Sequence, residues 1–71
     1  MTKIVHPDLL SDIAAYCARQ NMTRSAFGLA AVRDPRLVFD IEEGRELRSR
    51  TVERVRHFIN TGDPLADGDA A

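Results

Sequence analysis

Hydrophobic and polar positions alternate along the chain with a helical period, and the first apolar stripe predicts a helix from Asp8 or Pro7 to about Gln20. Its apolar side chains recur three or four positions apart, so they fall on one face: Leu9, Leu10, Ile13, Ala14 and Cys17. Asn21 follows as a plausible helix terminator, and Met22 as a hydrophobic plug between this helix and the next.

Two shorter helices are predicted between Thr23 and Gly44, separated by a break with a new start signal. Thr23 is suited to cap the first of them, because its hydroxyl can accept a free backbone N–H. The predicted buried stripe of this helix comprises Ala26, Phe27, Ala30 and Ala31. Gly28 lacks a side chain and would let a neighbouring helix approach closely.

The second of these helices is predicted from about Pro35 to Glu43. Asp34 can accept hydrogen bonds at a helix start, and Pro is preorganised for the first helical position. Gly44 is suited to the left-handed conformation that ends many helices. We expect the core-facing side to comprise Val38 and Ile41, with Leu37 at the edge and Arg36, Phe39, Asp40 and Glu43 outside.

A fourth helix is expected after a polar connection in which Leu47 packs against the core. Ser49 or Thr51 is its predicted cap, and the segment from Asn60 to Pro64 contains the Gly and Pro expected after a helix end. The apolar stripe of this helix comprises Val52, Val55, Phe58 and Ile59.

Four helices with short connections predict an all-α, four-helix domain, and no segment shows the strict alternation of a strand. We expect a short N-terminal arm over residues 1–7, one domain over 8–61, and an acidic, disordered tail over 62–71.

Length and composition limit the classes of function. With 71 residues, the chain has room for one small core and no separate catalytic domain. The first residues lack a secretory signal, which favours a cytoplasmic location, and no stretch is apolar enough to span a membrane. Cys17 is the only cysteine, so an intrachain disulfide or a cysteine-rich zinc site is impossible.

The formal net charge of −1 conceals an uneven distribution of charge. Residues 1–60 hold ten basic and eight acidic side chains, whereas the last eleven residues hold only acidic ones. Nine of the ten basic residues are Arg, which suits two-pronged contacts to phosphate or guanine.

The stretch from Thr23 to Gly44 resembles the lambda-repressor and Cro-like helix-turn-helix family, also called the xenobiotic-response-element type. The resemblance has no gap. It starts with a polar cap, an apolar residue and a small residue, which are Thr23, Phe27 and Gly28. A second cap, two core aliphatic residues, a Glu and a Gly follow, which are Asp34, Val38, Ile41, Glu42 and Gly44. One departure is Val32, which stands where the family prefers Gly in the turn; a β-branched residue resists a left-handed backbone.

This resemblance implies a compact helical domain of four or five helices that binds double-stranded DNA, with residues 35–43 as the recognition helix. The base-reading positions here are occupied by Arg36, Leu37, Phe39 and Asp40. Arg36 is the best candidate for reading guanine, and its alternative roles are a phosphate contact or an ion pair with Asp40 at the i,i+4 spacing. Phe39 can touch a thymine methyl group, contact another subunit or fold back over the last helix.

The resemblance also implies phosphate contacts. Arg24 stands at the start of the second helix, where this fold commonly touches the DNA backbone. The other candidates flank the recognition helix: Arg33, Arg45, Arg48 and Arg50. In the family the acidic residue at Glu42 braces the domain, so we expect it to pair with Arg45, Arg48 or Arg54.

Enzyme functions lack the necessary residues, since there is no phosphate-binding Gly-rich loop and no nucleophile with a matching His and acid. His6 and His57 are far apart in sequence, and neither has a carboxylate or cysteine at a metal-ligand spacing. We therefore expect both at the surface or at the margin of the core, with no metal and no cofactor. Cys17 is interpreted as a small buried hydrophobe.

The leading hypothesis is therefore a small sequence-specific transcriptional regulator of bacterial or phage type. A homodimer would place two recognition helices about 34 Å apart on two half-sites, and Phe58 and Ile59 are the expected dimer contacts. The acidic Asp40 and Glu43 favour a second hypothesis, a module of the same fold that docks on RNA polymerase, a toxin or another regulator without binding DNA.

Overall fold

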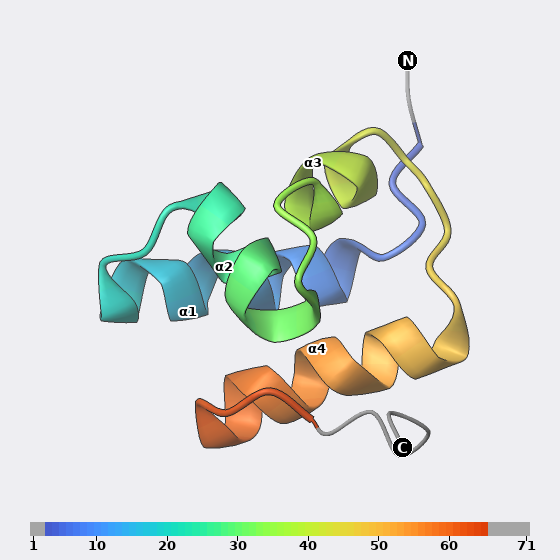
Figure 1. The fold of residues 1–71 in the computed structure, drawn as a ribbon. Helices are drawn as coiled ribbons and strands as arrows, with labels where there is room; N and C mark the ends of the chain where they lie inside the picture. The colour runs from blue at the N-terminus through green and yellow to red at the C-terminus, as the bar shows by residue number, and fades with distance from the viewer. Residues whose placement is uncertain (1–2, 66–71) are drawn as a thin grey trace.

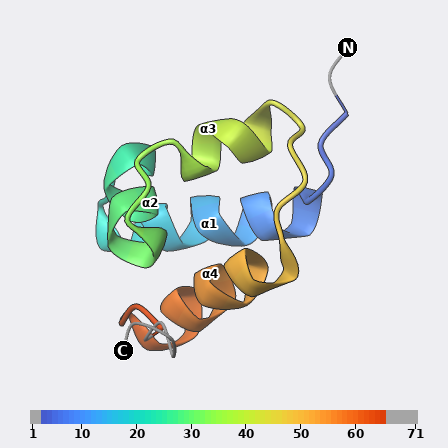
Figure 2. The same ribbon diagram turned by 45° about the vertical axis from the view of Figure 1, so that its right-hand side comes forward.

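Every regular element in residues 3–65, the part of the chain described by the computed structural model, is an α-helix (Figure 1). The four helices are α1 (Pro7–Gln20), α2 (Arg24–Val32), α3 (Leu37–Glu42) and α4 (Ser49–Thr61). α1 lies between α3 and α4, and α2 contacts all three (Figure 2). The predicted all-α, four-helix architecture is confirmed.

Local signals set both ends of α1 as expected. Pro7 is its first residue, and Asn21 ends it in the left-handed conformation, with φ of 56°. The N–H of Met22 donates to the carbonyl oxygen of Cys17 at 2.9 Å, and the Met22 side chain packs against the core. The Thr23 hydroxyl then accepts the N–H of Ala26 at 3.1 Å, which confirms the predicted cap of α2.

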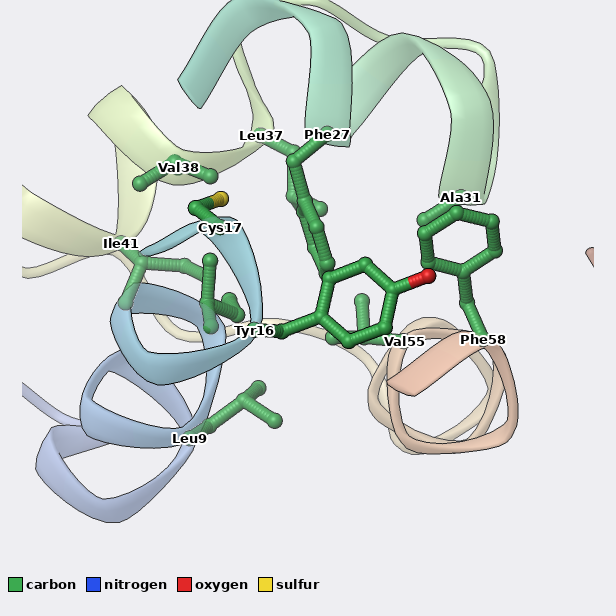
Figure 3. Packing of buried hydrophobic residues seen from close by; sticks show 11 residues of the cluster. Leu9, Tyr16, Cys17, Phe27, Ala31, Leu37, Val38, Ile41, Val55 and Phe58 are labelled. Atoms are coloured by element: carbon green, nitrogen blue, oxygen red, sulfur yellow. The ribbon is translucent and has the colours of Figure 1, made fainter. Parts of the chain in front are cut away.

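Three aromatic rings join α1, α2 and α4 in the core (Figure 3). Phe27 is 0% exposed; its ring centroid lies 5.7 Å from that of Tyr16 and 5.4 Å from that of Phe58, edge to face in both cases. Tyr16 and Phe58 also contact each other, with centroids 5.4 Å apart. The remaining buried hydrophobic residues are Leu9, Ile13, Cys17, Ala31, Leu37, Val38, Ile41 and Val55.

The buried faces of α1 and α2 differ from the predicted stripes. Ala14, Ala26 and Ala30 are exposed, whereas Tyr16 is buried. α1 lies between α3 and α4, so its buried arc is wide enough to include Tyr16, which contacts α2 and α4. In α2 the Phe27 ring directs one side of the helix toward this cluster, leaving Ala26 and Ala30 outside.

α3 begins later than predicted, because the residues after α2 form a turn first. The left-handed residue is Arg33, with φ of 60°, so Val32 remains helical and avoids the strain expected for it. The Asp34 carboxylate accepts the N–H of Arg36 at 2.9 Å, and the Asp34 carbonyl accepts that of Leu37 at 3.1 Å. Asp34 and Pro35 therefore shape the turn, and α3 begins at Leu37, which is buried rather than at the edge.

Gly28 permits the closest backbone approach between α2 and the turn before α3. A Cβ atom placed on Gly28 would lie 2.2 Å from the Asp34 carbonyl oxygen and 3.1 Å from the Cβ of Leu37. The N–H of Asp34 also donates to the Gly28 carbonyl at 3.1 Å. The expected role of Gly28 in close helix packing is thus confirmed.

α3 ends in two backbone hydrogen bonds around a left-handed glycine. Gly44 has φ of 91°; its N–H donates to Ile41, and the N–H of Arg45 donates to Asp40, each at 3.0 Å. This is the Schellman arrangement, and it confirms the predicted role of Gly44.

α4 begins without the expected cap. Arg48 precedes its first residue and makes no side-chain cap, and neither Ser49 nor Thr51 occupies the capping position. The far end agrees with the sequence, because Gly62 terminates α4 with φ of 78°.

His6 lies at the margin of the core, and it ties the N-terminal arm to the connection between α3 and α4 by a contact that the sequence did not predict. Its Nε2 accepts the N–H of Leu47 at 2.9 Å in a partly buried position. Leu47 packs against the core, as predicted.

The proposed acidic tail falls largely on residues 66–71, outside the described residues. Within residues 3–65, no helix is long and apolar enough to cross a membrane.

Replacing Gly28 with Ala tests the close approach of α2 to the turn. In an open helix interior this change would stabilise the protein by about 1 kcal/mol. Here the added methyl meets backbone, and we expect destabilisation by about 2 kcal/mol in urea unfolding. Ser25→Ala, at an exposed position of the same helix, is the control and should change stability little. Stabilisation by Gly28→Ala would contradict the geometry.

The His6→Ala variant tests the link between the arm and the α3–α4 connection. Loss of the acceptor leaves the partly buried N–H of Leu47 unpaired, and we expect a loss of about 1 kcal/mol together with faster hydrogen exchange at that amide. His57→Ala is the matched control. Unchanged exchange at Leu47 would show that the bond contributes nothing.

Candidate nucleic-acid interface

Arg24 braces α2 against α3. One guanidinium nitrogen of Arg24 lies 2.7 and 3.0 Å from the two carboxylate oxygens of Glu42. The guanidinium carbon also lies 5.0 Å from the centroid of the Phe39 ring, in cation–π geometry. Glu42 therefore has the bracing role expected for it, but its partner is Arg24 rather than an arginine further along the chain.

This brace changes the interpretation of two predicted contact residues. Arg24 was expected to face phosphate, yet its charge is already compensated by Glu42. Phe39 does not fold over α4; it lies against Arg24 and stays 37% exposed. Both side chains therefore contribute to the contact between α2 and α3.

Arg36 directly precedes α3 and is exposed. The possible pair with Asp40 is not formed, because the Asp40 carboxylate lies 4.0 Å from Nε of Arg45 instead. Among residues 3–65, Arg36 has no ion-pair partner, so its guanidinium is available at the start of α3.

Exposed arginines border α3 at both ends. Arg33 and Arg36 lie in the turn before the helix, and Arg45 and Arg48 lie in the connection after it. Arg50 is exposed in the first turn of α4. The fold thus brings the predicted phosphate-binding residues to the segments that flank α3.

The face of α3 itself offers little chemistry for reading bases. Leu37 is 3% exposed and packs in the core, so its side chain does not face outward as a base-reading position would require. Asp40 and Glu43 are acidic, and no residue of Leu37–Glu42 is basic.

One arginine that the sequence did not single out for binding lies beside a pocket near this interface. The pocket of about 360 Å³ lies among the α2–α3 turn, α3, the following connection and the start of α4. Arg54 is one of its lining residues, and Nε of Arg54 is buried without a hydrogen-bond partner in the described chain. The sequence gives no signal that Arg54 lines a pocket, because four separate segments of the chain form it.

A second hollow, of about 420 Å³, lies between the N-terminal arm, α1 and the Arg24–Glu42 brace, and it is mainly apolar. Cys17 lines it and is buried, as predicted; burial raises the pKa of its thiol, which disfavours the reactive thiolate. In the described part of the chain no three potential ligands gather in a way that could hold a metal ion.

The expected dimer contact at the end of α4 is only partly available. Phe58 is 5% exposed and belongs to the aromatic core, and Ile59 is partly buried beside it. Exposed large apolar side chains lie elsewhere, notably Leu29 on α2, which is 56% exposed.

No protein-family model, curated protein or solved structure shows significant similarity to this chain.

A double-mutant cycle of Arg24→Ala and Glu42→Ala measures the brace. Because both side chains are partly exposed, we expect a coupling of about 0.5–1 kcal/mol in urea unfolding, reduced by added salt. The pair Arg56 and Asp12 is the control and should couple more weakly, because its atoms lie 3.5 Å apart and Asp12 is more exposed than Glu42. Equal coupling in the two cycles would contradict a special role for the brace.

Proposed function

We propose that this protein is a small sequence-specific regulator that binds double-stranded DNA through the α2–α3 pair. The observation that carries the proposal is the placement of exposed arginines before and after α3, while the helix itself is held by the core and the Arg24–Glu42 brace. Basic side chains on both sides of a rigid helix suit contacts to phosphates on the two sides of a groove.

In this proposal Arg36 reads a base and the arginines after α3 hold the backbone. Arg36 directly precedes the helix and is unpaired within residues 3–65, so it can donate two hydrogen bonds to guanine. Arg45, Arg48 and Arg50 contact phosphates, which carry affinity but no sequence information.

The internal pairing of charges reduces the repulsion that an acidic helix would exert on DNA. Glu42 is compensated by Arg24, and Asp40 lies near Arg45. Glu43 is then the acidic residue of this segment without an ion pair in the described chain.

Such a domain presents one recognition helix and covers few base pairs. We therefore propose a homodimer on two half-sites separated by about 34 Å, one turn of the duplex.

A second candidate function is docking on another protein, such as polymerase, a toxin or another regulator, without DNA contact. The partly exposed Phe39 and the acidic Glu43, four residues apart at the end of α3, favour it. An exposed aromatic ring is typical of protein interfaces, and a carboxylate without an ion pair would repel phosphates.

A titration with duplex DNA at increasing salt tests the proposal. We expect the parent to bind random duplex at about 50 mM salt and to lose affinity steeply as salt rises. The Arg48→Ala/Arg50→Ala double variant should bind more weakly. Its slope of log affinity against log salt concentration should be shallower by about two. Arg36→Ala should retain the salt slope and lose sequence preference in selection from a random duplex library.

Arg56→Ala is the control, because Arg56 pairs with Asp12 of α1 rather than flanking α3. Absence of binding by the parent at about 50 mM salt, where phosphate contacts are strongest, would refute DNA binding. That result would favour the protein-docking function.

A further inference from the structure

We infer that the pocket beside Arg54 is a binding site for an oxyanion of the phosphate class. The pocket has a volume of about 360 Å³ and lies among the α2–α3 turn, α3, the following connection and the start of α4. The inference extends the proposed function, under which the oxyanion is a phosphodiester of the duplex. Its central residue is Arg54, which no preceding step of that function uses.

The unsatisfied donor of Arg54 is the first observation. Arg54 is partly buried, its Nε is buried, and within residues 3–65 this atom has no acceptor. A buried donor without a partner costs about 1–3 kcal/mol, and more when the group is charged. Because Arg54 lines the pocket, an acceptor that enters there lies beside its guanidinium, and a shift of the side chain would bring the buried Nε–H to it.

The balance of charge around the pocket is the second observation. Three arginines line it, Arg45, Arg48 and Arg54, and three carboxylates do so as well: Asp34, Asp40 and Glu46. Asp34 accepts the neutral backbone N–H of Arg36, which leaves its charge in place, and Asp40 lies near Arg45. In the described chain Arg48 and Arg54 have no ion pair, and neither do Asp34 and Glu46, so the formal charge of the lining is balanced and two guanidinium groups have no carboxylate partner.

The start of α4 adds hydrogen-bond donors to the same pocket. Arg48 makes no side-chain cap, so no side chain satisfies the first N–H groups of this 13-residue helix through a cap. Thr51, in its first turn, lines the pocket and offers a hydroxyl. An oxyanion is the ligand that accepts from a guanidinium, a hydroxyl and a helix start together.

The pocket also connects the ligand to α3. Leu37 and Asp40 of that helix line it beside the arginines. A phosphate held by Arg54 would therefore fix the distance between α3 and the backbone of a bound duplex, with Arg48 at the rim. Asp34 and Glu46, which have no ion pair in the described chain, limit the site to a single anion.

Inorganic phosphate is the probe for the first experiment, added to the full chain at constant ionic strength with chloride as the reference. We expect the NMR signal of the Arg54 Nε–H to shift saturably, with a fitted dissociation constant, while that of Arg56 on the same helix shifts little. In Arg54→Gln the apparent affinity should fall at least tenfold. Arg54→Lys retains the charge without Nε and should bind with intermediate affinity; Arg56→Gln should bind as the parent does.

Duplex DNA is the probe for the second experiment and identifies the source of the phosphate. We expect Arg54→Gln to weaken DNA binding about tenfold and to lower the salt slope by about one. Saturable phosphate binding without any DNA binding supports the pocket while the proposed function fails. A linear, unsaturable shift, or equal phosphate affinity in Arg54→Gln and the parent, overturns the inference whatever the DNA result. If Arg54→Gln does not give a dispersed spectrum, the comparison of Arg54→Lys with the parent decides by the same criteria.

Discussion

The ring of Phe27 lies against both Tyr16 and Phe58, and through these contacts α1, α2 and α4 share one interior. Phe27 is fully buried, and burial of such a side chain contributes about 1.5–3 kcal/mol, a large share of the stability of a small domain. The next residue, Gly28, faces the turn before α3. Two adjacent residues of α2 therefore determine where the other three helices lie.

The position of α3 depends on tertiary contacts rather than on its own stability. A helix of six residues is too short to persist alone in water. Val38 and Ile41 bury one side of it, Arg24 pairs with Glu42 near its end, and Gly44 closes it with the Schellman bonds. A helix held in this way is rigid enough to present the residues around it, which matters more here than the chemistry of its own face.

The uneven distribution of charge explains how a chain with a net charge of −1 can gather arginines around one helix, since residues 1–60 hold ten basic and eight acidic side chains. Two carboxylates of the α3 segment are used internally, by Arg24 and near Arg45. The arginines that flank α3, together with Arg54 and the pocket beside it, then lie around a segment whose own acids are largely compensated. The total charge is a poor guide to binding in such a chain, because its basic and acidic side chains are unevenly distributed.

Signals that act within a few residues determined the helices from sequence alone. The Thr23 cap, the terminators Asn21, Gly44 and Gly62, and the core positions Val38 and Ile41 depend on adjacent backbone groups and on helical period, so the pattern was sufficient for them. Tertiary structure decided the rest: that Tyr16 is buried while Ala26 is exposed, that Arg24 pairs with Glu42, that His6 reaches Leu47, and that Arg54 borders a pocket. Each of these depends on which distant segments meet. Helix packing decides which side chains face each other across the core, and the periodicity of the sequence does not show this.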